Sequence, residues 1–517
     1  MNKILSVLLF IVMLTTLVSV NVFGDKEISV EIDGNKLLFD QPPLIINDRT
    51  MVPLRGIFEA LGTTVSWDET ERKVTAVKDN TTICLVIDSI TATVDNKEVK
   101  LDQPPVIING RTLVPVRFIS ESQGADVEWL SSERTVSIDT KFSKLSEKMQ
   151  NVLRGFDELC GKDTLDWLLS LYDPDTGMIY YSVSARDNEP FLPDLESTIQ
   201  AYRSIQANVF EGDPMIEVLP EIGRKLVPVV QGMQDPDDGY YYHPQWGKNI
   251  TDSRRERDNS WGNGLLTMFG AKPLYPTVAE RLRSAMQPAD SASVPDYLQS
   301  EEKYMAWLKS LPWDSHPYSA GNSINAAMTN IKAAGFYNIT TEYLISIQNP
   351  ETGLWGKEVN ETGVNAAFKC LSFFNKDNPY PHVDKLVEST IQVVKAAPSS
   401  TSSMMYNRYE VIRAAKNTYG DNLSPEIAER LQEVMPEFLE LILEDAKRYK
   451  QADNGYSYLP DRSTGKSQGA PVSLGLAEGD VNSVSKCSVT ARSAAYSLAG
   501  LKVKPAYRAY RDYVVEK

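Results

Sequence analysis

The stretch Tyr343-Leu-Ile-Ser-Ile-Gln348-Asn-Pro-Glu-Thr-Gly353-Leu-Trp355 runs from an apolar, helix-like segment into a tight turn. The same succession recurs at residues 167–177 and 229–239, and in a shorter form at residues 449–455. Proline at the second turn position presets φ, and glycine accepts the left-handed conformation that ends such a turn. The turns start 62, 114 and 103 residues apart. Because the last two intervals are about twice 55 residues, we expect a degenerate copy inside each.

A helix rich in small residues is expected after each turn, beyond an irregular polar and aromatic stretch. These helices are predicted at residues 194–205, 263–271, 321–334, 365–374 and 488–501. Small residues let helices pack closely, which favours a central ring, whereas longer amphipathic helices such as the one after Ser424-Pro425 would pack outside it. About 365 residues divided into repeats of about 55–62 residues make roughly six helical hairpins. The sequence therefore predicts an all-α (α/α) toroid over residues 152–517.

The segment from Tyr343 to Trp355 resembles the Gln-and-Trp turn repeat of the terpenoid cyclase and prenyltransferase α/α toroids. The resemblance implies the toroid fold, an architecture that also carries many polysaccharide lyases and glycosidases acting on uronic acid glycans. It does not choose the chemistry, because one fold hosts many functions. Asp235-Pro-Asp237-Asp238 spells the DxDD acid motif of class II terpene cyclases, but it occupies the same turn as its counterparts. We therefore interpret it as a turn and reject a cyclase.

Residues 28–139 contain an internal repeat with an offset of 62 residues. Asp40-Gln-Pro-Pro-Leu-Ile-Ile-Asn-Asp-Arg-Thr-Met-Val-Pro-Leu-Arg55 returns as Asp102-Gln-Pro-Pro-Val-Ile-Ile-Asn-Gly-Arg-Thr-Leu-Val-Pro-Val-Arg117, and the offset continues through Gly62/Gly124 and Trp67/Trp129. Alternating apolar and polar residues predict strands at 28–32 and 127–129, and helical spacing predicts short helices at 56–61 and 118–123 that end at the glycines. The region is thus expected to be a small α/β module of mostly antiparallel strands and short helices.

This duplicated pattern resembles the copper amine oxidase N-terminal-like domain. The resemblance implies a module that recurs on secreted bacterial proteins, and we expect a stalk or an adhesive spacer. It does not imply an amine oxidase, because that enzyme needs three histidine ligands for copper and a tyrosine-derived quinone. The whole chain has three histidines, none of them in this region. We interpret Arg55 and Arg117 as pairing partners of other side chains rather than as ligand contacts.

The first residues are typical of an export signal. A basic start, Met1-Asn-Lys3, precedes the apolar run 4–20 and then Val22-Phe-Gly24, which predicts a signal peptide over residues 1–24. A membrane anchor is the alternative, although the apolar run is shorter than the roughly 20 residues a spanning helix needs. The protein is thus expected to be secreted or held at the cell surface, with no membrane span after cleavage. The polar residues 140–151 are expected to be a linker.

The overall charge limits the partners. The formal net charge is −16, and an acidic protein repels phosphate backbones, so nucleic acid is excluded as a partner. Only three histidines and four scattered cysteines are present, which argues against a metal site. We expect no cofactor.

Candidate site residues lie in the stretches that follow the turns. His243 and His316 lie in aromatic loops beside expected ring helices, and histidine is the side chain most easily used for proton transfer near neutral pH. The cationic segment from Arg254 to Arg257 offers guanidinium forks for a carboxylate beside an aromatic ring, although a solvated loop is the simpler explanation. Further candidates for substrate binding are Trp261, Trp355, Arg186 and Asp187.

Two hypotheses follow for the function. The first is an exported, glycan-active toroid enzyme that acts on a polysaccharide or cell-wall glycan, a polysaccharide lyase in preference to a glycoside hydrolase. In similar lyases a Tyr or His removes the proton beside a uronate carboxylate that Asn, His or Arg has neutralised. The resemblance thus implies His316 and Tyr318, with His243, as proton-transfer groups, and Asn322 and Arg255 on the carboxylate. The alternative is a non-catalytic surface protein in which the duplicated module anchors or spaces a glycan-binding toroid.

Overall fold

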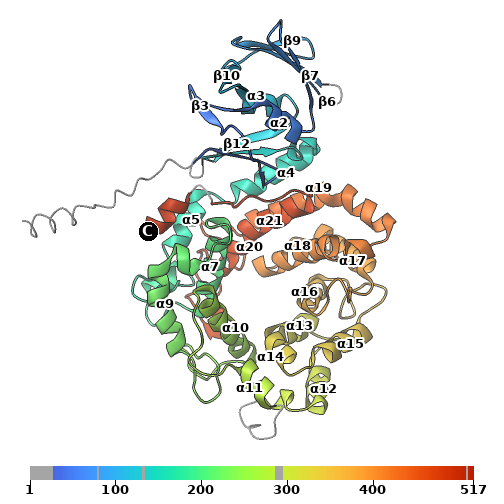
Figure 1. Cartoon of the computed structure of the whole chain (residues 1–517). Helices are drawn as coiled ribbons and strands as arrows, with labels where there is room; N and C mark the ends of the chain where they lie inside the picture. Colours follow the sequence, from blue (N-terminus) through green and yellow to red (C-terminus); the bar gives the residue numbers. More distant parts are fainter. Residues whose placement is uncertain (1–26, 79–80, 131–133, 286–294, 508–509, 517) are drawn as a thin grey trace, which may run out of the picture. The chain divides into compact units, whose positions relative to one another are not determined.

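The computed structural model describes residues 27–78, 81–130, 134–285, 295–507 and 510–516, and the chain divides into two compact units, residues 1–143 and 144–517 (Figure 1). Each unit is described by itself. The signal peptide predicted at residues 1–24 lies outside the described residues. Within the described ranges, no helix has both the length and the apolar run that crossing a bilayer requires.

The linker predicted at residues 140–151 is partly helical. The boundary between the units falls after Ser143, and α4 (Glu147–Glu158) begins inside the predicted segment. Ser146 caps this helix, and its Oγ accepts a hydrogen bond from the Met149 amide at 3.3 Å. Because Met149 is buried, the last residues of the predicted linker belong to the helical unit.

The described residues of unit 1 form three sheets and two short helices, which confirms the predicted mostly antiparallel module. The sheet orders are β12-β13-β1-β2, β10-β11-β4-β3 and β5-β6-β7-β8-β9, and β1–β13 is a parallel pair. The strands are β1 (Ser29–Ile32), β2 (Asn35–Lys36), β3 (Leu44–Ile46), β4 (Arg49–Pro53), β5 (Thr64–Asp68), β6 (Lys73–Lys78), β7 (Thr81–Val86), β8 (Thr91–Val94), β9 (Lys97–Lys100), β10 (Val106–Ile108), β11 (Arg111–Pro115), β12 (Asp126–Leu130) and β13 (Thr135–Asp139).

The two repeats of unit 1 exchange strands. Hairpin β1–β2 of the first repeat joins a sheet with β12–β13 of the second, and β8–β9 of the second lies in one sheet with β5–β6 of the first. In the middle sheet β4 pairs with β11 so that Val52 lies opposite Val114, which is its equivalent at the 62-residue offset. The repeats are therefore related by a local two-fold axis. Reciprocal side-chain hydrogen bonds follow from it: Arg49–Asp102 with Arg111–Asp40, and Asn47–Gln103 with Asn109–Gln41.

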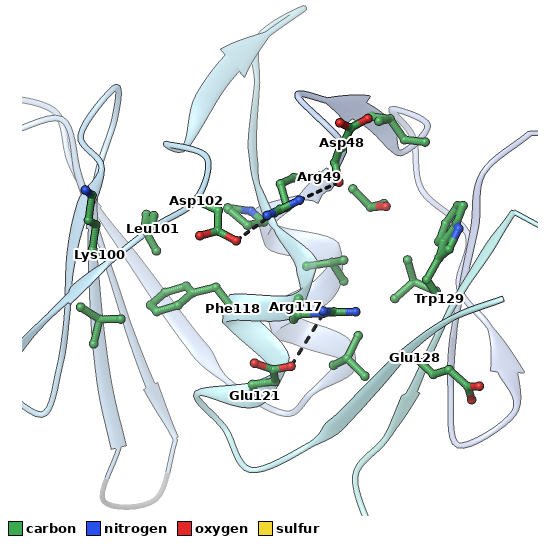
Figure 2. Close-up of a pocket in the computed structure, with 17 residues that line it drawn as sticks. Asp48, Arg49, Lys100, Leu101, Asp102, Arg117, Phe118, Glu121, Glu128 and Trp129 are labelled. Carbon is green, nitrogen blue, oxygen red and sulfur yellow. Dashed lines mark hydrogen bonds and ion pairs between the residues drawn. The ribbon is translucent and has the colours of Figure 1, made fainter. Parts of the chain in front are cut away.

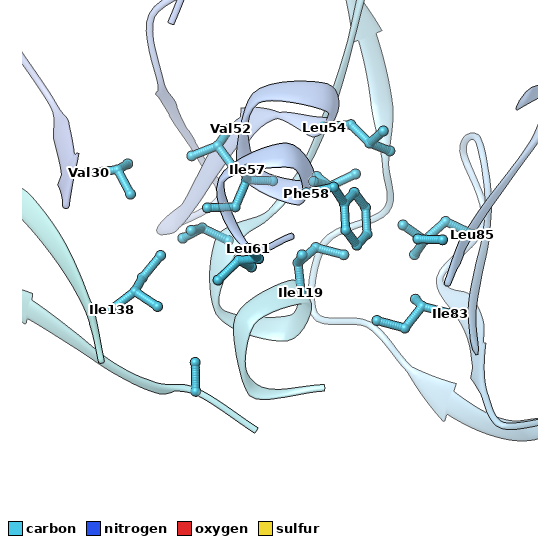
Figure 3. Close-up of a cluster of buried hydrophobic side chains, with 14 of the residues drawn as sticks. Val30, Val52, Leu54, Ile57, Phe58, Leu61, Ile83, Leu85, Ile119 and Ile138 are labelled. Carbon is cyan, nitrogen blue, oxygen red and sulfur yellow. The ribbon is translucent and has the colours of Figure 1, made fainter. Parts of the chain in front are cut away.

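The core of unit 1 surrounds the two helices, α2 (Leu54–Ala60) and α3 (Val116–Glu121) (Figure 3). Both helices begin directly after a proline, two residues earlier than predicted, because the φ of proline suits a helix start. They bury Ile57, Phe58 and Ile119 completely. The glycines predicted to follow them, Gly62 and Gly124, are left-handed, as expected for helix C-caps.

Unit 2 is helical, and six of its helices pack in an order that closes on itself. In this order α7 packs on α10, α10 on α13, α13 on α16, α16 on α18, α18 on α20, and α20 on α7 (Figure 1). We call these the inner helices. Their bounds are α7 (Leu195–Asn208), α10 (Asp252–Met268), α13 (Pro317–Ala326), α16 (Glu361–Cys370), α18 (Ser402–Asn417) and α20 (Val481–Cys487).

The remaining elements of unit 2 connect or cover the inner helices. As predicted, Ser424 caps the long helix α19 and Pro425 is its first residue. The other helices and strands are α5 (Lys162–Leu169), α6 (Val183–Asp187), α8 (Met215–Val218), α9 (Pro220–Gly232), α11 (Val278–Ala285), α12 (Glu301–Ser310), α14 (Met328–Ala333), α15 (Tyr337–Ile347), α17 (Val383–Ala396), α19 (Pro425–Lys447), α21 (Val489–Leu498), α22 (Arg511–Glu516), β14 (Lys466–Ser467) and β15 (Ala470–Pro471).

Helix α10 starts eleven residues before the helix predicted at 263–271. The cationic segment from Arg254 to Arg257 is therefore helical and not a solvated loop. The Thr251 side chain starts the helix by accepting a hydrogen bond from the Arg254 amide at 3.1 Å. The sequence hides this helix because it is buried on several sides, so its apolar residues do not repeat at a helical interval.

The predicted turns have the expected backbone at three of the four positions. Gly177, Gly239 and Gly353 have φ values of 74, 79 and 67°. In the fourth turn Asn454 takes the left-handed conformation, with φ 73°, and Gly455 serves another purpose. A Cβ on Gly455 would lie 2.7 Å from the Trp167 ring, so this glycine allows close packing.

The DxDD segment is a turn, as interpreted from the sequence. One carboxylate oxygen of Asp235 accepts hydrogen bonds from the amides of Asp237 and Asp238 at 2.9 and 3.3 Å, and the other pairs with Lys248 at 2.6 Å. Both oxygens of the Asp235 carboxylate therefore have partners that stabilise the turn.

We expect Gly353→Ala to destabilise unit 2 more than Gly335→Ala. Both glycines have positive φ, 67 and 81°, so an alanine Cβ strains the backbone by about 1–2 kcal/mol at either position. At Gly353 the Cβ would also lie 2.5 Å from the Leu386 amide nitrogen, whereas at Gly335 nothing lies within 4 Å. This overpacking adds about 1–3 kcal/mol. Urea unfolding of the intact chain measures the difference, and equal losses would contradict the packing explanation.

Candidate functional site

Hydrogen bonds join the first two turns of neighbouring inner helices. Between α10 and α13, Arg257 Nη2 donates to Asn322 Oδ1 at 2.5 Å. Between α18 and α20, the hydroxyls of Ser402 and Ser483 lie 2.8 Å apart. The amino-terminal turns of these helices therefore meet, and side chains from different helices come together there.

A buried ion cluster joins the starts of α7 and α10. The guanidinium of Arg254 is fully buried, and its nitrogens lie 2.9 Å from Asp258, 3.3 Å from Glu196 and 3.6 Å from Asp194. The Ser467 hydroxyl of strand β14 donates to the same Glu196 carboxylate at 2.6 Å. One cation thus holds α7, α10 and the β14–β15 hairpin together.

Three further cations come from three inner helices, and we call Arg257, Lys369 and Lys486 the basic cluster. Arg257 lies six residues after the capping residue Thr251 of α10, and Lys486 six residues after the capping residue Asp480 of α20. Lys369 lies on α16 between them in packing order. None of the three forms an ion pair with a carboxylate among the described residues, in contrast to Arg254.

The charges of the basic cluster act on one another. Burial lowers the pKa of Lys369 well below its ordinary value, and the positive charges of Arg257 and Lys486 lower it further, while Glu196 opposes them. Burial also lowers the pKa of Lys486, against the opposing effect of Asp480 and Glu196. Grouping cations in this way is unfavourable without an anion, so the cluster is suited to receive one.

Tyr318 lies beside the basic cluster. The Lys369 Nζ is 5.9 Å from the centre of its ring. Burial raises the pKa of Tyr318 to about 12, with Tyr458 and Glu196 adding to the rise and Arg257 opposing it. The phenol is therefore protonated at neutral pH and is able to donate a proton.

Gly321 lets α13 and α16 approach closely enough to bring Tyr318 and Lys369 together. A Cβ at this position would lie 3.0 Å from Lys369 Cβ and 3.3 Å from the Ala366 carbonyl oxygen. The small residues that predicted a close-packed ring helix thus have a direct effect on the site.

The structure brings together two of the residues assigned from the sequence, Tyr318 and Asn322. His316 lies directly before α13 without a capping hydrogen bond from its side chain, and its exposed imidazole has Nδ1 3.1 Å from the Ser315 hydroxyl. Arg255 is wrong as the carboxylate ligand. It pairs with Asp252 at 2.8 Å and lies over the Tyr240 ring. Two residues correspond to about 200° of helical rotation, so Arg255 lies on the opposite face of α10 from Arg257.

His243 is a structural residue in this fold, and its assignment as a proton-transfer group is corrected. The imidazole is fully buried, its Nε2 lies 3.0 Å from the Pro193 carbonyl oxygen, and its Nδ1 accepts a hydrogen bond from the Gln245 amide at 3.3 Å. Burial lowers its pKa to about 4, the Pro193 carbonyl opposes this, and the charge of Arg254 lowers the pKa further. Both nitrogens are thus occupied by the backbone.

The four remaining residues assigned from the sequence have other partners in the fold. Trp355 is fully buried and donates to the Leu344 carbonyl at 3.0 Å, so its face is closed to a sugar. Trp261 is buried against the Arg254 guanidinium, 5.2 Å from its ring centre. Arg186 and Asp187 pair with each other at 2.7 Å at the surface.

Lys369 and Lys486 were not predicted from the sequence, and within the cationic segment Arg255 was favoured over Arg257. A signal was present, since Arg257, Asn322 and Lys486 each lie six residues after a helix cap. That spacing becomes visible only when the helix starts are known.

The comparisons with known proteins concern unit 1. Residues 31–138 match the copper amine oxidase N-terminal domain, so this part of the chain is such a domain. A comparison with curated proteins finds no match to the chain. The domain contains no histidine, so it does not supply the imidazole ligands of a copper site. Among the described residues, no group of three or more His, Cys, Asp or Glu side chains is arranged to hold a metal ion.

We expect Arg254→Met to destabilise unit 2 by about 3–5 kcal/mol, because it leaves three carboxylates without their buried cation. Arg224→Met is the control, since its ion pair with Glu221 is exposed and contributes little. Chemical denaturation followed by circular dichroism measures both. Similar, small losses in the two variants would show that the cluster does not stabilise the fold.

A second buried carboxyl on α10 makes stability depend on pH. Glu256 accepts hydrogen bonds from Tyr240 at 2.8 Å and Asn330 at 2.6 Å, but it has no ion pair among the described residues. Burial raises its pKa to about 7, and the hydrogen bonds from Tyr240 and Tyr297 and the charge of Arg255 oppose the rise only partly. Between pH 4.5 and about 7, Glu256 is therefore mostly protonated in the folded protein, whereas the same carboxyl is mostly ionised in the unfolded chain.

Stability should fall as pH rises through the window from about 4.5 to 7, where the folded protein binds more protons at Glu256 than the unfolded chain. We expect Glu256→Gln to remove this loss, which amounts to about 3 kcal/mol. Unfolding free energies at pH 5 and pH 8 test it, with the exposed Glu217→Gln as control. If Glu256→Gln changed stability equally at both pH values, the buried carboxyl would not be the source.

Proposed function

We propose that unit 2 is an α/α toroid that binds an anionic polysaccharide at the basic cluster and cleaves it by β-elimination. The observation that carries the proposal is the grouping of Arg257, Lys369 and Lys486 from three inner helices, none with a carboxylate partner in the described part of the chain. In a protein of net charge −16, cations left unpaired in this way favour an anionic ligand. The closed packing order of the inner helices supports the toroid.

A uronate unit fits this set of groups. Arg257 presents a guanidinium fork that Asn322 orients, and a fork binds a carboxylate through two parallel hydrogen bonds. Lys486 adds a second positive charge. Neutralising the carboxylate makes the proton on the adjacent C5 easier to remove, which is the difficult step of elimination.

The remaining groups then have distinct roles. Lys369, whose pKa is lowered by burial and by the charges of Arg257 and Lys486, takes the C5 proton, the electron pair forms the C4–C5 double bond, and the C4–O bond breaks. Tyr318 donates its proton to the leaving glycosidic oxygen, and the proton on Lys369 returns to the phenolate beside it. The products are a chain with an unsaturated uronate at one end and a chain with a restored hydroxyl, so atoms and charges balance.

Export supports access to such a substrate. The signal peptide expected at residues 1–24 would deliver the protein outside the cell, where acidic polysaccharides are found. The copper amine oxidase N-terminal domain then serves as a spacer or anchor. In the alternative hypothesis unit 2 binds the same polysaccharide without cleaving it, and turnover distinguishes the two.

We expect the intact protein to release unsaturated ends, seen as ultraviolet absorbance, from at least one of pectate, alginate, hyaluronan, chondroitin sulfate and heparin. Tyr318→Phe should lower kcat by at least about a hundredfold with binding unchanged, because only the proton donor is lost. Lys486→Met should weaken binding, and the surface variant Lys303→Met should behave like the parent.

Binding without turnover in the parent protein would leave the non-catalytic alternative. Neither binding nor turnover across the five polysaccharides would overturn the proposal for unit 2.

A further inference from the structure

Exposed side chains recur in both repeats of unit 1. Repetition of core residues such as Val52 and Val114 is required because each repeat must fold. The exposed pairs Arg55 with Arg117 and Glu59 with Glu121, however, are not explained by packing. The pair Trp67 and Trp129 recurs as well; Trp67 is exposed, whereas Trp129 is half-buried and packs partly against the core. Trp67 is 42 % exposed, which is unusual for so large an apolar ring. The exposed Arg117–Glu121 pair, at 3.8 Å, adds little stability.

In the second repeat these residues line a pocket of about 640 Å³. In Figure 2 Arg117 is drawn between the Phe118 ring and the Trp129 ring, with Arg49 and Asp102 on one side of it. Arg49 Nε donates to Asp102 Oδ2 at 2.9 Å, so donors and acceptors alternate around the opening. The volume lies in the range of pockets that hold small organic ligands, which is enough for one or two sugar rings.

The chemistry of the pocket suits an uncharged sugar. Two guanidinium groups and one ammonium group face four carboxylates in the lining, so the charges nearly cancel with a slight negative excess, which disfavours a strongly anionic ligand. A sugar hydroxyl is both a donor and an acceptor, so it can bind a guanidinium and a carboxylate together. The flat, apolar face of a pyranose ring packs against an aromatic ring such as Trp129, which is a large apolar surface with a polar edge.

The first repeat presents the equivalent groups. Arg55, Glu59 and Trp67 are exposed at the offset positions, and the ion pair Arg111–Asp40, at 2.6 Å, replaces Arg49–Asp102. The residue equivalent to Phe118 in the first repeat is Gly56. The Phe39 ring packs against this glycine, so closely that a Cβ on Gly56 would lie 2.9 Å from the ring. An aromatic ring thus lies beside the helix in both repeats.

We propose that unit 1 carries two equivalent binding sites for an uncharged, pyranose-based polysaccharide, one per repeat, centred on Trp67 and Trp129. The local two-fold axis that relates the repeats also relates the two sites. A polymer offers many identical sugar units, so one chain or one surface can occupy both sites. Simultaneous occupation raises the apparent affinity well above that of a single site. This proposal does not rest on the function proposed for unit 2.

Calorimetry with the full chain tests the proposal, with cellohexaose and chitohexaose as separate probes. We expect one of these probes to bind with a stoichiometry of two per chain. Trp129→Ala and Trp67→Ala should each reduce the stoichiometry to one at unchanged Kd, and the double variant should not bind. Arg117→Ala, at an exposed position that leaves the fold intact, should weaken the second-repeat site about tenfold. The unit 2 variant Lys369→Met should bind as the parent does.

Binding to the insoluble polymer reports the two-site arrangement. For cellulose or chitin, matching the hexasaccharide that binds, each single tryptophan variant should lose at least about tenfold in apparent affinity, because only one site remains. The proposal is overturned if neither hexasaccharide binds, if the parent stoichiometry is one, or if binding survives in the double variant. If the parent protein bound a hexasaccharide as expected but cleaved none of the acidic polysaccharides, only the function proposed for unit 2 would be contradicted.

Discussion

The buried guanidinium of Arg254 is the interaction on which the helical unit depends. Its three carboxylate neighbours come from two inner helices, α7 and α10, and one of them also accepts a hydrogen bond from the β14–β15 hairpin. Removing a cation from water is costly unless paired groups surround it. The charge is therefore compensated only when the starts of α7 and α10 lie side by side. Arg257, three residues further along α10, is then directed to the face where Lys369 and Lys486 lie.

The same α10 helix carries groups with opposite requirements. Arg254 is neutralised by carboxylates, Glu256 is buried without an ion pair among the described residues, and Arg257 has a guanidinium that contacts Asn322 and the Trp261 ring. A helix that buries this many ionisable groups contributes less to stability than an apolar one of the same length. Such an arrangement is typical of a site, because groups that cost stability are retained where they contact a ligand.

Unit 1 is constrained differently, because its two sequence repeats must fold together as one unit. Each repeat lends a hairpin to the sheet of the other, so neither repeat completes its sheets alone. The pairing of Val52 with Val114 sets the two-fold axis, and the ion pairs Arg49–Asp102 and Arg111–Asp40 follow from it. The interpretation of Arg55 and Arg117 as pairing partners holds for Arg117, which lies 3.8 Å from Glu121. That contact is exposed and weak, so the guanidinium remains accessible.

The sequence by itself determined the duplicated module, its strands and short helices, the turns at Gly177, Gly239 and Gly353, and the presence of helices rich in small residues. These features follow from local rules of turn geometry and periodicity. It also placed Tyr318 and Asn322 at the site. Only the tertiary structure separated Arg255 from Arg257, buried His243 and Trp355, and brought Lys369 beside Tyr318 and within reach of the charge of Lys486. The physical reason is that these choices depend on where a helix starts and which neighbour covers each face, and both are set by contacts between residues far apart in the chain.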